Sequence, residues 1–215
     1  MIKQTPIPKE ELELFKQLKD LKVIFDVGVR TDTDYLEIWP DSQHHLFEPN
    51  PEFFDELLKK IGAMGNKANI AISKYGLGEK NQVMSYVDGL QSFVDSKAIN
   101  NPYAAGNQLL PMKTLDTYIL ENNIKSIDFL KMDTEGYELK ILLGATNWFH
   151  IIKFIQYEHW GKHNDLMIRG LLSEHFDAFN VGYRNTFCMS KNLVSEEEKT
   201  ELKKYIEDNK LSQLQ

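Results

Sequence analysis

Short apolar runs alternate with segments of helical spacing along most of this chain. Five runs have the length and the β-branched content of buried strands, at residues 22–28, 43–48, 67–73, 127–133 and 151–158. Between and after them, apolar residues recur every three or four positions, which predicts helices over 31–39, 51–61, 115–122, 136–143 and 166–174. This alternation predicts a doubly wound, mostly parallel α/β sheet.

Two regions in the middle of the chain depart from the alternation. Residues 76–81 have turn chemistry and residues 82–87 alternate as a strand does, which predicts a β-hairpin insertion. The stretch 96–108 is rich in Asn, Gly and Ala, so we expect a long loop that closes over the substrate.

The end of the chain completes the predicted domain. Residues 176–182 and 186–190 predict an antiparallel strand pair, and Ser195 caps a charged helix over about 195–210. A chain of 215 residues suits one α/β domain with a hydrophobic core and is short for two. We therefore expect a single domain over 1–215, with its core at about 22–190.

Composition and charge narrow the classes of function. Hydrophobic residues make up 42% and charged residues 27%, as in soluble globular proteins. The net charge of -7 argues against a nucleic-acid-binding surface. Cys188 is the single cysteine, so an internal disulfide or cysteine cluster is excluded and a packing role is indicated. Without a signal-peptide core or a run of roughly 18 apolar residues, we expect a cytoplasmic protein that does not enter a membrane.

Carboxylates follow two buried strands that we expect to be neighbours. The segment Phe129-Leu-Lys-Met-Asp133-Thr-Glu135-Gly136 reads as a strand that ends in an acid, and Glu158 with His159 ends the next. Because the carboxyl ends of parallel strands form the ligand-binding edge of such a sheet, we expect these acids to face a substrate. They could position a hydroxyl, act as a general base or bind a divalent cation. The structural alternative is that Glu135 caps the next helix and backbone donors hold Glu158.

The first two strands have the features of a nucleoside site. Asp26-Val-Gly28 ends the first strand, where a glycine lets the backbone approach a ligand. Glu48 lies 22 positions later (48 − 26), about the spacing at which an acid binds both ribose hydroxyls. On spacing alone, Glu48 could equally be a solvated residue before Pro49. The chain lacks a full Gly-x-Gly-x-x-Gly, so a cofactor without phosphates, such as S-adenosylmethionine, is favoured over a dinucleotide.

Together, these motifs resemble the FkbM family of methyltransferases. The likeness rests on Asp26-Val-Gly28, Leu46-Phe-Glu48-Pro-Asn-Pro51, Asn69-Ile-Ala71-Ile-Ser73, Lys113-Thr-Leu-Asp116, Lys131-Met-Asp133-Thr-Glu135-Gly136-Tyr-Glu138, Gly144-Ala145 and Phe154-Ile-Gln-Tyr-Glu158. It covers about residues 22–160. The resemblance implies a Rossmann-like class I methyltransferase fold and S-adenosylmethionine-dependent O-methylation of a sugar, glycan or small-metabolite hydroxyl.

The resemblance also implies roles for particular residues. The cofactor would contact Asp26, Gly28, Glu48, Ala71 and Ser92. Of these, Glu48 would bind the ribose, Ala71 would pack near the adenine, and Ser92 would lie near the methionine end. The acceptor site would contain Asp133, Glu135 and Glu158, and Asp133, Glu158 or His159 would take the hydroxyl proton.

The first motif departs from the family pattern. Where the family continues Asp-Val-Gly-Ala-Asn-x-Gly, this chain has Arg30 in place of the asparagine and Asp32 in place of the second glycine. Asp32 would crowd the cofactor or contact its ammonium group. Arg30 would pair with the methionine carboxylate or with Asp32. If Asp32 abolishes cofactor binding, the chain is a non-catalytic binding module.

Two further hypotheses concern an NAD cofactor and a bound metal ion. An NAD-dependent sugar-modifying enzyme would share the argument from Glu48, but the missing glycines and the absence of a Tyr-x-x-x-Lys pair disfavour it. Three carboxylates could bind Mg²⁺, although no histidine-rich cluster requires a metal. The sequence carries no signal for the identity of the acceptor or for the oligomeric state.

Overall fold

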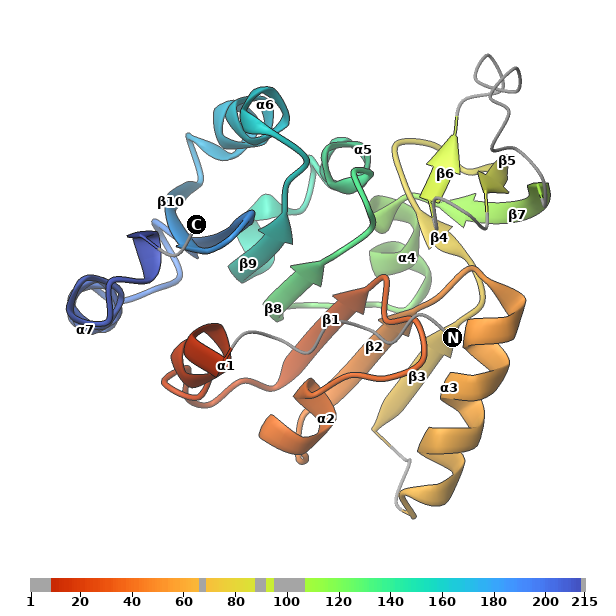
Figure 1. The fold of residues 1–215 in the computed structure, drawn as a ribbon, viewed down its shortest axis with the longest axis horizontal. Coiled ribbons are helices and arrows are strands. Elements are labelled where there is room, and N and C mark those ends of the chain that lie inside the picture. The colour runs from red at the N-terminus through yellow and green to blue at the C-terminus, as the bar shows by residue number, and fades with distance from the viewer. Residues whose placement is uncertain (1–8, 66–68, 88–91, 95–106, 214–215) are drawn as a thin grey trace.

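A seven-stranded sheet organises the computed structural model, which describes residues 9–65, 69–87, 92–94 and 107–213 (Figure 1). Its strands are β1 (Val23–Val27), β2 (Gln43–Phe47), β3 (Ile70–Ser73), β8 (Ile127–Met132), β9 (Ile152–Glu158), β10 (Phe176–Gly182) and β11 (Asn185–Ser190). Their order across the sheet is β10-β11-β9-β8-β1-β2-β3. From β3 to β9 the pairs are parallel, whereas β11 is antiparallel to β9 and to β10. The predicted doubly wound sheet with an antiparallel C-terminal pair is confirmed.

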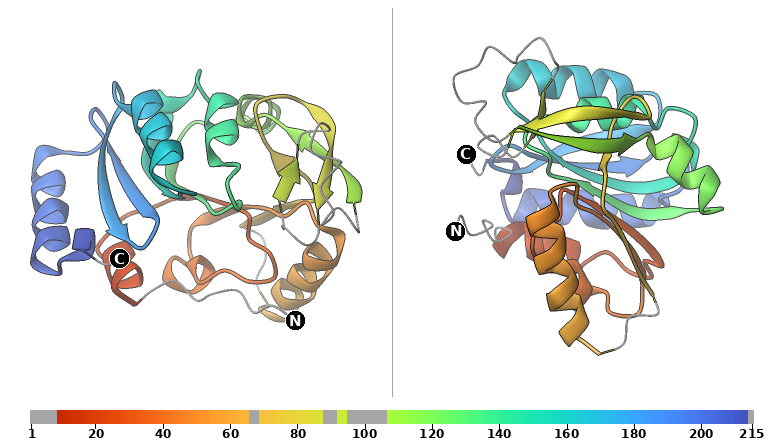
Figure 2. Two further views of the ribbon diagram at one scale, coloured as in Figure 1. Left: turned by 45° about the horizontal axis from the view of Figure 1, so that its top comes forward. Right: turned by 90° about the vertical axis from the view of Figure 1, so that its right-hand side faces the viewer.

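Helices cover both faces of this sheet. They are α1 (Lys9–Phe15), α2 (Tyr35–Ile38), α3 (Pro51–Ala63), α4 (Leu115–Glu121), α5 (Glu138–Leu143), α6 (Lys162–Leu172) and α7 (Glu196–Asp208), with 3-10 turns at Phe149–Ile151 and Leu211–Gln213. Helices α4, α5 and α6 pack on one face, and α1, α2, α3 and α7 pack on the other (Figure 2). Burial on both faces explains why the central strands are nearly continuous apolar runs. None of the helices in the described part of the chain has the length and apolar character that crossing a bilayer requires.

A second, four-stranded sheet forms the insertion. Its strands are β4 (Gly76–Leu77), β5 (Gln82–Val87), β6 (Ser92–Val94) and β7 (Asn107–Lys113), in the order β4-β7-β5-β6. Because β5 is antiparallel to both β6 and β7, the predicted hairpin is present but belongs to a larger sheet. Most of the predicted closing loop, 96–106, lies outside the described residues.

Strand β7 is missed by the sequence analysis because it contains Pro111, and a proline argues against a strand. Pro111 lies opposite Val83 of β5, whereas β4 pairs with β7 only at Met112 and Lys113. Within the described residues, β7 therefore has no second neighbouring strand at Pro111. A proline is tolerated on such an open side because no ladder hydrogen bond is lost there.

Two helices differ from the predictions at the N-terminal end. No element is predicted at α1 from the sequence, although Leu14 and Phe15 of this helix are fully buried. The helix predicted over 31–39 is reduced to the single turn α2 by side chains that hold the preceding loop. The N–H of Thr33 donates to Oδ1 of Asp32 (2.9 Å), and the N–H of Tyr35 donates to Oγ1 of Thr33 (3.3 Å). Such local hydrogen bonds compete with helix formation.

Candidate functional site

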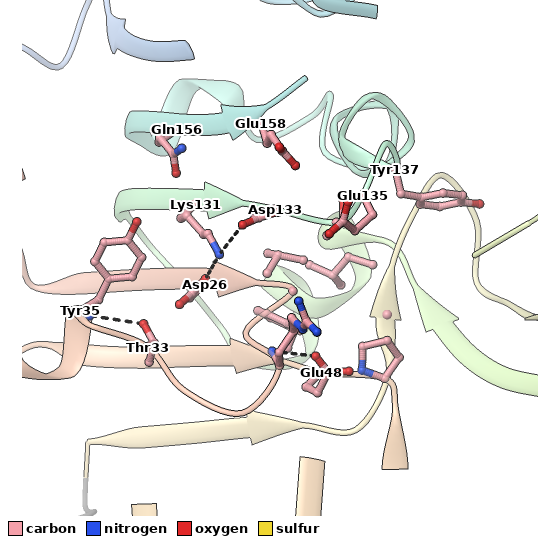
Figure 3. Close-up of a pocket in the computed structure, with 18 of the residues that line it drawn as sticks. Asp26, Thr33, Tyr35, Glu48, Lys131, Asp133, Glu135, Tyr137, Gln156 and Glu158 are labelled. Carbon is pink, nitrogen blue, oxygen red and sulfur yellow. Dashed lines mark hydrogen bonds and ion pairs between the residues drawn. The ribbon is translucent and has the colours of Figure 1, made fainter. Parts of the chain in front are cut away.

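A cavity of about 520 Å³ lies at the carboxyl ends of β1, β2, β8 and β9, beside the second sheet (Figure 3). Eight of the eleven residues predicted from the sequence line it: Asp26, Gly28, Arg30, Asp32, Glu48, Asp133, Glu135 and Glu158. They meet because parallel strands bring their carboxyl ends to one edge of the sheet. The predicted cofactor group and the predicted acceptor group thus share one cavity.

A buried lysine connects the two groups. Lys131 pairs with Asp26 in the register of β8 and β1. Its ammonium nitrogen lies 3.2 Å from Oδ1 of Asp26 and 3.8 Å from Oδ2 of Asp133 (Figure 3). Burial acts to lower the pKa of Lys131, but the charges of Asp26 and Asp133 outweigh it and raise the pKa above its usual value. Lys131 therefore stays charged and compensates the acids at this edge of the sheet.

Three carboxyl groups converge at the ends of β8 and β9. Asp133 and Glu158 are brought side by side because Met132 and Tyr157, which precede them, pair in the sheet. Burial first, and then the charges of Asp133 and Glu135, raise the pKa of Glu158 well above its usual value, and Glu158 hydrogen-bonds to Asp133. Burial and the charge of Asp133 also raise the pKa of Glu135. The protonated form of Glu158, hydrogen-bonded to Asp133, is therefore favoured near neutral pH.

A lysine provides positive charge between these acids. No group of three or more His, Cys, Asp and Glu side chains in the described ranges is arranged to hold a metal ion. The ammonium group of Lys131 lies between Asp26 and Asp133, where it contacts a carboxylate on each side.

The turn after β1 depends on Gly28 and Glu48. Gly28 has a φ of +84°, and a Cβ atom there would lie 2.0 Å from the carbonyl oxygen of Asp133. The carboxylate of Glu48 accepts the N–H of Arg30 (2.8 Å) and the N–H of Asn50 (2.7 Å). Burial raises the pKa of Glu48 to about 7, against the opposing effect of these hydrogen bonds. Glu48 is buried and held in place, so the solvated alternative is excluded.

Arg30 and Asp32, the two departures from the family pattern, do not pair with each other. Asp32 accepts the N–H of Thr33 and forms a 3.1 Å ion pair with Lys60 of α3, and its side chain is 66% exposed. The guanidinium carbon of Arg30 lies 5.2 Å from the centre of the Phe53 ring. Lys60 therefore draws the Asp32 carboxylate towards α3, although Arg30 and Asp32 both line the cavity.

Glu138 builds the turn after β8, and the sequence analysis does not assign it to the site. Its Oε1 accepts the N–H of Thr134 (2.8 Å), the hydroxyl of Thr134 (2.9 Å) and the N–H of Gly136 (3.3 Å). These bonds hold a turn in which Glu135 has a φ of +56°. Burial raises the pKa of Glu138 to about 7. Helix α5 has Tyr137 at its N-cap, so Glu135 is not the cap that the structural alternative required.

Ala71 and His159 are not among the residues that line the cavity, and the side chain of Ser92 lies outside the described part of the chain. Ala71 is half-buried in β3, and Ser92 begins β6 opposite Val87. His159 follows Glu158, and the centre of its ring lies 6.5 Å from the centre of the Tyr157 ring. Burial lowers the pKa of His159. Their predicted roles stay predictions, and the geometry favours the carboxyl groups over His159 as proton acceptor.

A polar row on β9, β11 and α1 also lines the cavity and is missed by the sequence analysis. Nε2 of Gln156 donates to Oδ1 of Asn185 (2.9 Å), and Nδ2 of Asn185 donates to Oε1 of Glu11 (2.9 Å). The sequence does carry a signal for polar groups at this site, because Gln156 and Lys131 lie inside otherwise apolar strands. A buried polar residue in such a run requires a partner, but the sequence does not say which.

Comparisons with known proteins agree with the motifs. The sequence profile of a family described as "Methyltransferase FkbM domain" matches residues 26–184, which confirms the resemblance. The hexuronic acid methyltransferase AglP of Haloferax volcanii is 23% identical to this chain over 161 residues. The match covers 75% of this chain and 65% of AglP, so the chain spans slightly less than two thirds of that relative.

Solved methyltransferase structures share the fold. Methyltransferase FkbM from Methylobacillus flagellatus KT aligns with a TM-score of 0.57 and 16% identity over 79% of this chain and 43% of its own. An rRNA methylase from Streptococcus thermophilus aligns with a TM-score of 0.53 and 12% identity over 88% of this chain and 98% of its own. The N-terminal domain of human METTL16, in complex with SAH, aligns with a TM-score of 0.51 and 14% identity over 91% of this chain and 73% of its own. At these identities the likeness shows the fold alone, and the expected Rossmann-like methyltransferase fold is confirmed.

Proposed function

The chain belongs to the FkbM methyltransferase family, and we propose that it is an S-adenosylmethionine-dependent O-methyltransferase acting on a hydroxyl of a sugar, glycan or small metabolite. The observation that carries this proposal is the meeting of two groups in one cavity. A nucleoside-type group lies at the ends of β1 and β2, and an acidic group lies at the ends of β8 and β9. A methyl donor in the first group and a hydroxyl in the second would be adjacent, as an in-line displacement requires.

The residues of the first group fit this cofactor. Glu48 has two carboxylate oxygens with lone pairs beyond those used by backbone N–H groups, and these can accept ribose hydroxyls. Phe47 and Leu77 line the same cavity and offer apolar surface to an adenine ring. The carboxylates of Asp26 and Asp133 give the cavity an acidic character that suits ammonium and sulfonium charges. When bound, S-adenosylmethionine supplies the activated methyl group.

The residues of the second group would handle the acceptor hydroxyl. Methylation of a hydroxyl oxygen releases its proton, which a positioned carboxylate can accept. The pKa of Glu158 is raised to about 8, which favours its protonated form near neutral pH, and Glu158 hydrogen-bonds to Asp133. Lys131 lies against Asp133 and limits its motion. We assign Asp133 as the proton acceptor, with Glu158 as its partner.

A carbohydrate acceptor has the better support. The name of the relative AglP states a hexuronic acid as its substrate, whereas one structural neighbour is an rRNA methylase. Binding to RNA relies on positive charge against the phosphate backbone. The net charge of -7 and the acidic lining of the cavity disfavour such a ligand. The hydroxyl groups of a carbohydrate are neutral and carry no such penalty.

Asp133→Asn tests the catalytic assignment. The amide keeps the shape of the side chain but cannot accept the hydroxyl proton, so we expect methyl transfer to fall by roughly 10²- to 10⁴-fold. The affinity for S-adenosylhomocysteine should stay near the wild-type value. The measurements are release of S-adenosylhomocysteine with a panel of sugars, and calorimetric binding of the same compound.

The matched control for this test is Asp55→Asn on α3, an exposed carboxylate that does not line the cavity. It should leave both readouts unchanged. Full activity of Asp133→Asn, or a loss of folding equal to its loss of turnover, would sink the assignment of Asp133 as proton acceptor.

A further inference from the structure

The side of the cavity formed by β9, β11 and α1 contains a buried hydrogen-bond acceptor without a partner. Gln156 is 5% exposed and uses its Nε2 to bind Asn185. Its Oε1 is buried and has no hydrogen-bond partner among the described residues. Figure 3 shows Gln156 directed into the same space as Lys131 and Glu158. A buried acceptor left unpaired is destabilising, so this atom is suited to a donor that enters the cavity.

Two exposed aromatic rings lie near this side of the cavity, and of the two only Tyr183 is among its lining residues. Tyr183 lines the cavity and is 62% exposed, and Trp160 is 50% exposed. The guanidinium carbon of Arg184 lies 4.8 Å from the centre of the Trp160 ring and 4.9 Å from that of Tyr183. A cation held against both rings limits their motion.

The Trp160 ring is also close to the predicted acceptor site. A Cβ atom on Gly136, the residue after Glu135, would lie 3.7 Å from atoms of the Trp160 side chain. The Trp160 ring therefore offers flat apolar surface within one residue of the acidic group. Exposed large aromatic side chains beside a cavity are typical of ligand-binding surfaces.

The charge of this side selects against anionic ligands. Its lining includes Glu11, Asp133, Glu135 and Glu158; Lys131 is already held by carboxylates, and the cation beside it, Arg184, is held against the rings of Trp160 and Tyr183. A carboxylate or phosphate that entered here would be placed among like charges in a partly buried setting. A neutral ligand with hydroxyl groups meets acceptors instead, at the carboxylates and at the free amide oxygen.

We propose that this side of the cavity is an acceptor subsite for an uncharged pyranose ring. Oε1 of Gln156 accepts a sugar hydroxyl, and the rings of Trp160 and Tyr183 pack against the C–H face of the sugar or of the next sugar in a glycan. This inference rests on the proposed function and narrows its acceptor to a neutral carbohydrate. Aromatic rings also stack on nucleobases, but the acidic lining disfavours a polyanion.

The experiment measures glycan binding by protein saturated with S-adenosylhomocysteine. The probes are immobilised neutral hexose glycans, the corresponding uronic acid glycans, and a single-stranded RNA oligonucleotide. We expect preference for the neutral glycans, and binding at least about tenfold weaker in Trp160→Ala, Tyr183→Ala and Gln156→Leu. Trp160→Phe should keep most of the binding. Leu120→Ala, an exposed apolar residue of α4 outside the cavity lining, is the matched control.

The outcomes separate this inference from the proposed function. If S-adenosylhomocysteine binds but uronic acid glycans or RNA are preferred, the neutral subsite is overturned and the methyltransferase proposal stands. The neutral subsite is also overturned, and the methyltransferase proposal stands, if no glycan binds or if folded Trp160→Ala and Tyr183→Ala proteins bind glycans as the wild type does. If S-adenosylhomocysteine does not bind, the proposed function fails and the subsite fails with it.

Discussion

Buried charges at the edge of the main sheet depend on one another residue by residue. Asp26 and Asp133 flank the ammonium group of Lys131, so removal of Lys131 would leave both acids without their counter-charge, and removal of either acid would leave Lys131 with one carboxylate. The sequence identifies the acids of this cluster because carboxylates at strand ends stand out against apolar runs. It does not identify Lys131 as their partner, because only the register of β8 against β1 shows which side chains meet.

Glu138→Gln should reduce the pH dependence of stability. The pKa of Glu138 is raised to about 7 in the folded protein, whereas an unfolded glutamate titrates near 4.3. Between these values the folded state binds more protons, so stability decreases as pH rises through this window, by on the order of 3 kcal/mol. The amide variant does not titrate and should lack this loss. Urea unfolding at about pH 5 and about pH 8 measures it.

The control for this prediction is Glu56→Gln, which changes an exposed glutamate of α3. It should keep the wild-type pH dependence. A Glu138→Gln protein that loses as much stability as the wild type between the two pH values would show that burial of Glu138 does not have the effect described.

At the scale of elements, the strands and most helices could be predicted because each is bounded by a local signal. Ser195, for example, caps α7 as predicted, with its hydroxyl oxygen accepting the N–H of Glu198. The elements that were missed depend on tertiary context. Helix α1 is stabilised by burial of Leu14 and Phe15 against the sheet, and β7 accommodates Pro111 through its pairing pattern. The contact between the turns after β1 and β8 is likewise visible only in three dimensions.

Gly28→Ala tests that contact. Gly28 and Gly65 both have positive φ, +84° and +87°, so an alanine at either site carries a similar backbone strain of about 1 kcal/mol. At Gly28 the new Cβ would collide with the carbonyl oxygen of Asp133, at 2.0 Å, whereas at Gly65 no atom of the described residues lies within 4 Å. We expect Gly28→Ala to lose more than about 3 kcal/mol in urea unfolding, well beyond Gly65→Ala. Equal losses would mean that the two turns do not constrain each other.

At the scale of the whole molecule, the cavity joins segments that are far apart in the chain. The cofactor group comes from the first quarter of the sequence, the acidic group from the ends of β8 and β9, and part of the acceptor side from α1. Topology alone predicts the first two, because the sheet brings strand ends to one edge. It does not predict Glu11, because the docking of α1 onto β11 has no local signal in the sequence.

The central claim is that this cavity binds S-adenosylmethionine despite Asp32. Calorimetric titration with S-adenosylmethionine and S-adenosylhomocysteine tests it most directly, on the wild type and on Asp32→Gly. Because Lys60 and the N–H of Thr33 hold the Asp32 carboxylate, we expect micromolar binding to both proteins, within about threefold of each other, or about 0.65 kcal/mol. Absence of binding by folded wild-type protein, above all if Asp32→Gly restores it, would contradict the account and favour a binding module that has lost its cofactor.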